Sequence, residues 1–202
     1  MKMKNIITRS VGLFPLSMVV LPKESVRLHI YQNQFKALVN DCFASGKDFV
    51  IPFIHNGNVT NYGTSVKLID VERFYPDGKM DIKVEGFAVV KIANVSKVKN
   101  NSYKVGQITT IESGLPSLHS AELKSLFFKH LAYSNITNVK KDTDLTIYDI
   151  ARNLTLTNEF KTNLFKHASN SMIQSKLLLN ELRLLVLTQE LQNAASFRYY
   201  MN

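Results

Sequence analysis

The sequence has little cysteine and no long hydrophobic run. Cys42 is the single cysteine among 202 residues, so no disulfide can form within the chain, and a small scaffold held together by disulfides is excluded. No stretch of about 18 apolar residues is present to span a membrane. The apolar segment Val11–Leu21 follows two lysines, as in a signal peptide, but Pro15 interrupts it and no small-residue cleavage site follows. These absences predict a cytoplasmic protein that does not associate with membranes.

The motifs of the common enzyme classes are missing as well. No cluster of glycines precedes a lysine and a hydroxyl residue, as a phosphate-binding loop requires, and no G-x-S-x-G or paired-carboxylate motif is present. The five histidines lack the spacing of metal ligands, and His130 lies on an apolar helix face typical of a hydrogen-bonded core residue. Cys42 lies on the predicted buried face of a helix, where cysteine behaves as a small hydrophobe. We therefore predict that the chain is not an enzyme, holds no metal or cofactor, and acts by binding another macromolecule.

The charge of the chain is strongly positive but evenly distributed. There are 25 Lys and Arg against 16 Asp and Glu, a formal net charge of +9. This excess favours acidic partners or nucleic acid. No basic run is longer than a pair, however, so the same charge is also typical of an ordinary solvated surface.

Two hydrophobic periods divide the chain near Gly114 and predict a first domain over residues 1–114 and a second over residues 115–202. Before that point, short segments alternate apolar and polar residues, as half-buried strands do, and turn residues such as Asn56–Gly57 separate them. Residues 33–45 are the exception: their apolar side chains recur at helical spacing, and Gly46 follows in the position of a C-cap.

After residue 114 the apolar spacing is helical. One helix is predicted around Leu123–Leu131, and Thr146 with Asp149 resembles a capping box that opens a second. A third is predicted over residues 158–167. The last and longest begins near residues 169–171 and is apolar nearly all round in its middle, so we expect it at the centre of a bundle or against the β domain.

An ordered series of motifs resembles the N-terminal substrate-binding domain of the ATP-dependent protease Lon. The first three correspond to the L-F-P-L, V-x-x-P-G and L-x-I-F-E-P-R-Y patterns of that family, and the remaining ones follow in the family's order. The series comprises Leu13-Phe14-Pro15-Leu16, Val20-Leu21-Pro22, Leu28-His29-Ile30-Tyr31, Gly63-Thr64, Asp77-Gly78, Val84-Glu85-Gly86, Leu145 to Ala151 with Leu154 and Leu156, and Glu159 to Leu164. The resemblance covers almost the whole chain.

The resemblance implies an α+β fold. Its first part is a mainly-β, PUA-like pseudo-barrel with one internal helix, and its second part is an α-helical bundle with a long C-terminal helix. It also implies that the ATPase module and the Ser-Lys peptidase module of Lon are lacking. Residues 32–35 read Gln-Asn-Gln-Phe where the family has E-P-R-Y, and Lys23 replaces the family's glycine after Pro22. The remaining motif residues, such as Phe14 and Gly86, are interpreted as scaffold.

We expect a non-catalytic module that binds proteins or peptides and acts as an adaptor in proteostasis. Its expected partners are unfolded or partly folded proteins, or a protease or chaperone complex, and a homo-oligomer is left open. Recognition of unfolded chains needs exposed apolar surface. The peptide-binding candidates are aromatic or neighbouring side chains, namely His29, Tyr31, Phe197, Tyr199 and Tyr200. The alternative explanation for the aromatic tail residues is that the tail packs back onto the bundle.

The alternative is an RNA- or nucleic-acid-binding protein, favoured by the net charge and by the PUA-like architecture, although kinship of fold is only an analogy. Binding through phosphates requires basic residues that converge on one face. The candidates for such a face are in the helical half, namely Lys140, Lys141, Lys161 and Lys166.

Overall fold

The computed structural model describes residues 8–97, 102–111, 120–137, 139 and 145–200, and of residues 196–200 only the backbone. Contacts within the chain divide it into two compact units. The first, the sheet unit, comprises residues 1–113 and 156–169, and the second, the helical unit, comprises residues 114–155 and 170–202. Helix α4 (Asn158–Lys166) therefore belongs with the strands, although it lies among the later helices in the sequence.

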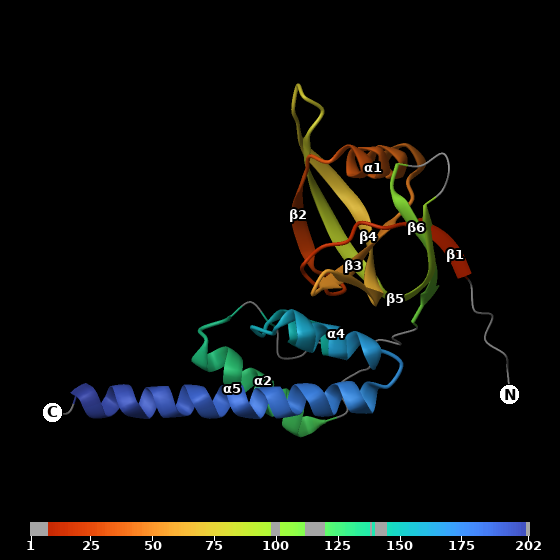
Figure 1. The fold of residues 1–202 in the computed structure, drawn as a ribbon. Coiled ribbons are helices and arrows are strands. Elements are labelled where there is room, and N and C mark those ends of the chain that lie inside the picture. Colours follow the sequence, from red (N-terminus) through yellow and green to blue (C-terminus); the bar gives the residue numbers. More distant parts are fainter. Residues whose placement is uncertain (1–7, 98–101, 112–119, 138, 140–144, 201–202) are drawn as a thin grey trace, which may run out of the picture. The chain divides into compact units, whose positions relative to one another are not determined.

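The sheet unit is built on one antiparallel sheet of six strands that curves into a barrel (Figure 1). The strands follow the order β1-β6-β5-β4-β3, and β2 pairs with β5 beside this path. Parallel bridges from Leu13 to Val50 and from Leu16 to Phe53 connect the segment after β1 to β3, which closes the barrel. The strands are β1 (Thr8–Gly12), β2 (Ser25–Ile30), β3 (Phe49–His55), β4 (Asn58–Phe74), β5 (Met80–Lys97) and β6 (Lys104–Thr110).

The core of the sheet unit follows the alternation in the sequence. Met80, Ile82 and Val84 on β5 are buried, and they pack in one cluster with Phe49 and the buried face of helix α1. Helix α1 (Asn33–Ser45) has the predicted bounds. It ends at Gly46, whose φ of 65° is the left-handed conformation that glycine adopts without a steric cost.

The helical unit contains α2 (Ala121–Tyr133), α3 (Ile147–Arg152) and α5 (Ser171–Tyr200). The predicted capping box is present: Thr146 accepts from the backbone N–H of Asp149, and the Asp149 side chain accepts from the backbone N–H of Thr146. His130 is buried, with Nδ1 3.1 Å from Oε1 of Gln189 on α5. The predicted core position of this histidine is therefore confirmed.

Helix α5 packs on one side only among the described residues. Leu178, Leu182 and Val186 are buried, whereas Leu184, Leu187 and Leu191 are 61%, 52% and 64% exposed. Within the helical unit this helix contacts α2 and α3, so the expected position at the centre of a bundle is not met on the face that carries the three exposed leucines. The predicted α+β fold with a barrel, an internal helix and a long C-terminal helix is confirmed. None of the described helices combines the length and apolar character needed to cross a bilayer.

Candidate functional site

Three aromatic rings gather where β2 ends and the turn between β4 and β5 begins. The His29 and Tyr31 rings, both predicted as binding residues, stack with centroids 6.1 Å apart and an interplanar angle of 23°. Tyr75 meets His29 edge-on, with centroids 5.7 Å apart at 80°. We call the exposed surface formed by His29, Tyr31 and Tyr75 the aromatic surface.

Asp81 holds two of these rings in place. Nδ1 of His29 lies 2.6 Å from Oδ1 of Asp81, and because an ionised carboxylate only accepts, Nδ1 carries the proton. The Tyr75 hydroxyl donates to Oδ2 of Asp81 at 2.7 Å. The hydrogen bond from His29, followed by the one from Tyr75, lowers the pKa of Asp81, and the bond to Asp81 raises the pKa of Tyr75. The orientation of the rings is therefore set before any partner arrives.

The aromatic surface is open to water. Tyr31 is 58% exposed, and the side chain of His29 is 50% exposed. The guanidinium of Arg73 lies 4.9 Å from the centre of the Tyr75 ring, a cation–π contact that further restricts this ring. Rings that are fixed in orientation but still hydrated can gain free energy by burial against a partner at little entropic cost.

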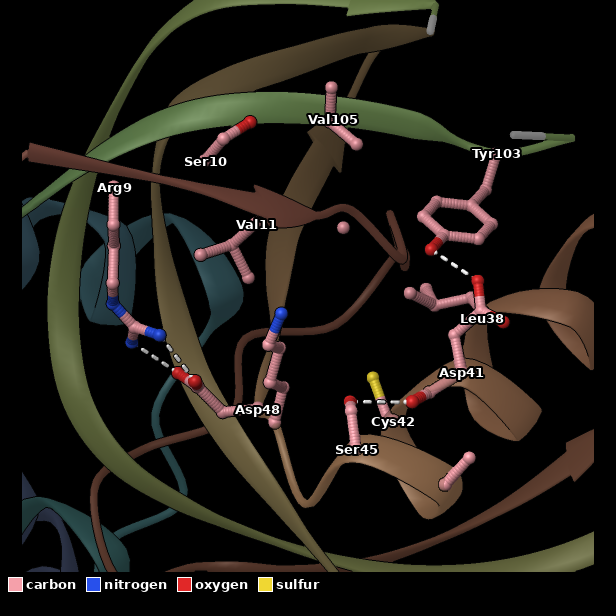
Figure 2. A pocket seen from close by; sticks show the side chains of 13 residues that line it. Arg9, Ser10, Val11, Leu38, Asp41, Cys42, Ser45, Asp48, Tyr103 and Val105 are labelled. Carbon is pink, nitrogen blue, oxygen red and sulfur yellow. Dashed lines mark hydrogen bonds and ion pairs between the residues drawn. The ribbon is translucent and has the colours of Figure 1, made fainter. Parts of the chain in front are cut away.

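A cavity of about 570 Å³ lies in the sheet unit between β1, β6 and the C-terminal half of α1 (Figure 2). Its charged side chains Arg9, Asp41 and Asp48 each bond to another residue of the cavity wall. The guanidinium of Arg9 donates to both carboxylate oxygens of Asp48, and the Tyr103 hydroxyl donates to Oδ2 of Asp41 at 2.6 Å. These pairs connect β1 to the residue before β3 and the residue before β6 to the C-terminal half of α1, which is a structural role.

Cys42 lies in the wall of this cavity and is 6% exposed. Burial, with a further contribution from the charge of Asp41, raises the pKa of its thiol to about 11. The thiolate is the nucleophilic form, so Cys42 is unreactive at neutral pH, as its place on the buried face of α1 predicts. No group of three or more potential metal ligands occurs among the residues that the structure describes.

Replacement of Asp48 by asparagine is expected to weaken the acid sensitivity of the fold. Burial raises the pKa of Asp48, but the hydrogen bonds from Arg9, its positive charge and further hydrogen bonds together outweigh burial and leave the pKa below its usual value. A lowered folded pKa gives stability that is present above the unfolded pKa of about 3.9 and lost as the pH falls through the folded value. At pH 7 the Asp48→Asn variant should lose about 1–2 kcal/mol.

Urea unfolding at pH 7, 5 and 3 measures this effect. Between pH 5 and 3 the variant should lose less stability than the wild type, since it lacks the group that protonates. Equal pH dependence of the two proteins would contradict the role assigned to the Arg9–Asp48 pair.

A comparison with models of protein families identifies the family of the chain. The model described as the ATP-dependent protease La (LON) substrate-binding domain matches residues 10–197. The chain belongs to this family. The comparison with curated protein sequences found no match.

Two solved structures have the fold of this Lon substrate-binding domain. The crystal structure of the Lon N-terminal domain protein from Xanthomonas campestris is 22% identical, with a TM-score of 0.66 over 84% of this chain and 97% of its own. The N-terminal domain of the Mycobacterium avium complex Lon protease is 16% identical, with a TM-score of 0.63 over 87% of this chain and 98% of its own. At these identities the two structures support the fold alone.

The other predicted site residues do not form a binding site in the described structure. Phe197, Tyr199 and Tyr200 lie at the end of α5, and their side chains are outside the described part of the chain, as are Lys140 and Lys141. Lys161 is half-buried and Lys166 exposed. Because they are five positions apart on α4, they point about 140° apart around the helix. The two described lysines therefore do not converge on one face.

Tyr75, Arg73 and Asp81 were missed by the sequence reasoning. Arg73 is at the end of β4, Tyr75 is in the turn that follows, and Asp81 is at the start of β5. The pairing of β2 with β5 brings them beside His29. The register sets Asp81 directly opposite His29. The turn at Pro76-Asp77-Gly78 signals a hairpin, but no local pattern indicates that β2 would pair along it.

Proposed function

We propose that this Lon substrate-binding domain is a non-catalytic adaptor that binds segments of unfolded or partly folded proteins through the aromatic surface. The observation that carries the proposal is the exposed His29–Tyr31 stack, in which Asp81 holds the His29 ring in place. The family supports a substrate-binding role, and the substrates of a protein-degrading system are polypeptides.

The chemistry of the aromatic surface suits unfolded chains. Unfolded segments expose apolar and aromatic side chains that a folded protein buries, and these can stack on Tyr31 and His29. An aromatic pair contributes about 0.5–1.5 kcal/mol beyond the burial of its area. Contacts of this size give reversible binding with broad sequence tolerance, because any apolar side chain gains by leaving water.

The test compares Tyr31→Ala with Phe43→Ala. The ring of Phe43 on α1 is 68% exposed and lies outside the aromatic surface, so it is a control for simple loss of exposed apolar area. Reduced, carboxymethylated α-lactalbumin serves as the unfolded probe and native α-lactalbumin as the folded one, with binding followed by fluorescence anisotropy. Tyr31→Ala should weaken binding of the unfolded probe about tenfold, which corresponds to about 1.4 kcal/mol.

Phe43→Ala should bind as the wild type does, and native α-lactalbumin should not bind. Equal loss in the two variants, or no preference for the unfolded probe, would refute the proposal.

Salt dependence separates protein binding from the nucleic-acid alternative. Binding through phosphates weakens steeply between 50 and 200 mM salt because counterions are released. Binding of an unfolded protein at the aromatic surface should change little over that range, because stacking on its rings forms no ion pair with the partner. Retention of an RNA oligonucleotide in place of the unfolded protein, with a steep salt dependence, would favour the alternative.

A further inference from the structure

Within the described part of the chain, strand β2 has one strand neighbour in the sheet. It pairs with the first half of β5, and β4 occupies the other side of that half. Figure 1 shows β2 at the margin of the barrel, and no other described strand pairs with it. An edge strand of this kind presents a row of backbone N–H and C=O groups that an additional strand can pair with.

The backbone hydrogen bonds between β2 and β5 determine which residues of β2 direct their backbone groups outward. The N–H of Gly86 donates to the C=O of Glu24 at 3.0 Å, and the next pair in this register is Ser25 opposite Glu85. In an antiparallel ladder, bonded and non-bonded residues alternate. The even-numbered residues of β2 therefore bond to β5, and Ser25, Arg27 and His29 direct their N–H and C=O groups away from the sheet.

The side chains along this edge leave it accessible. Ser25, Arg27 and His29 are exposed, whereas Leu28 and Ile30 point into the core. A charged residue on an edge strand usually discourages pairing. Here, however, Nε of Arg27 donates to Glu72 on β4 at 2.9 Å. Because β4 lies beyond β5, the Arg27 side chain extends over the sheet and not across the outer edge.

The outer edge leads directly into the aromatic surface. His29 belongs to both, and Tyr31 follows immediately after β2. A strand added beside β2 would place alternate side chains on the face that carries His29 and Tyr31, where apolar or aromatic groups could stack. Backbone pairing would give affinity without regard to sequence, and the rings would select apolar side chains.

We propose that an extended, apolar segment of a client polypeptide binds by adding a strand to the outer edge of β2. This inference rests on the proposed function and specifies how the client is held. The backbone groups of Ser25, Arg27 and His29 are the anchoring donors and acceptors, and the rings of His29 and Tyr31 contact the side chains of the added strand.

The decisive variant is Arg27→Pro, with Arg27→Ala as its matched control. Proline removes the outward N–H of residue 27 and projects its ring into the path of the added strand. It leaves the bonds of the flanking even-numbered residues to β5, since proline is tolerated on an edge strand whose N–H faces solvent. The alanine variant removes the same side chain and keeps the N–H.

The probe is the tightest-binding member of a set of overlapping 12-residue peptides that span reduced, carboxymethylated α-lactalbumin. Arg27→Pro should weaken its binding at least tenfold, and Arg27→Ala less than twofold. Far-UV circular dichroism during thermal unfolding checks that both variants fold. Equal affinities of two folded variants would overturn strand addition.

Modified peptides test the same inference on the wild-type protein, whatever the stability of the proline variant. Two versions of the probe carry N-methyl groups on alternate residues in the two possible registers. Only one register should lose binding by tenfold or more, because only alternate N–H groups of an added strand face β2. Equal binding of both versions would overturn the inference and leave the proposed function standing, whereas no binding of any unfolded probe to the wild type would overturn both.

Discussion

Replacing Phe49 with alanine is expected to lower the free energy of unfolding of the sheet unit by about 3–5 kcal/mol. Phe49 is fully buried at the start of β3, in the cluster that joins the barrel to α1. Its ring lies 6.0 Å from that of Phe14, which in turn packs 4.2 Å from the ring of Phe35 on α1. Alanine would leave a cavity that neither the strand nor the helix can close without losing pairing or packing elsewhere.

Phe43→Ala is the matched control for this prediction. It removes the same ring from a position that is 68% exposed, where substitutions usually change stability by less than about 0.5 kcal/mol. Urea unfolding followed by far-UV circular dichroism measures both variants, since the chain has no tryptophan to report by fluorescence. Similar losses in the two variants would show that Phe49 is not the centre of the core.

The helices could be predicted because their signals are local. The C-cap glycine after residue 45 and the capping box of Thr146 and Asp149 each lie within a few residues of the helix end they define. The grouping of α4 with the sheet had no such signal. It depends on contacts between distant segments, such as the 3.0 Å bond from the N–H of Val19 to Oδ1 of Asn158.

The candidate site was predicted in part for the same reason. His29 and Tyr31 are two residues apart on one strand, so their proximity follows from the period of a strand. Tyr75 and Asp81 join them only through the register of β2 on β5, and a shift of one residue would place Asp81 on the opposite face. No local pattern in the sequence indicates this register, and only the resemblance to the family implies it.

The departure at Lys23 has a structural meaning that the sequence alone leaves open. Lys23 has a φ of 62°, in the left-handed region. The glycine that the family pattern has at this position adopts such a conformation without cost, whereas a residue with a Cβ is strained by about 1–2 kcal/mol. The turn keeps its conformation nonetheless, because the N–H of Lys23 donates to the C=O of Gly86 at 2.7 Å and the N–H of Glu24 donates to that of Leu21 at 3.0 Å.

Gly86→Ala is expected to destabilise the sheet unit by about 3 kcal/mol, at the upper end of the usual cost of overpacking. A Cβ at Gly86 would lie 2.5 Å from the carbonyl oxygen of Leu21 and 3.2 Å from its carbonyl carbon. Neither atom can rotate away, because the 21–24 turn is bonded to Gly86 from both sides through Lys23 and Glu24. Relief of the contact would require that the turn separate from β5, and β2 begins immediately after that turn.

Gly106→Ala distinguishes this effect from the general cost of a methyl group in a buried strand. Neither glycine has a left-handed φ, but the Cβ at Gly106 would meet side-chain methyl groups, Cγ2 of Ile92 at 2.9 Å and Cδ1 of Leu13 at 3.2 Å. Such groups can shift by rotation, so the loss should be about 1 kcal/mol. Urea unfolding of both variants measures the difference. A Gly86→Ala variant as stable as Gly106→Ala would mean that the turn moves freely, and the outer edge of β2 would then have no fixed starting point for a client strand.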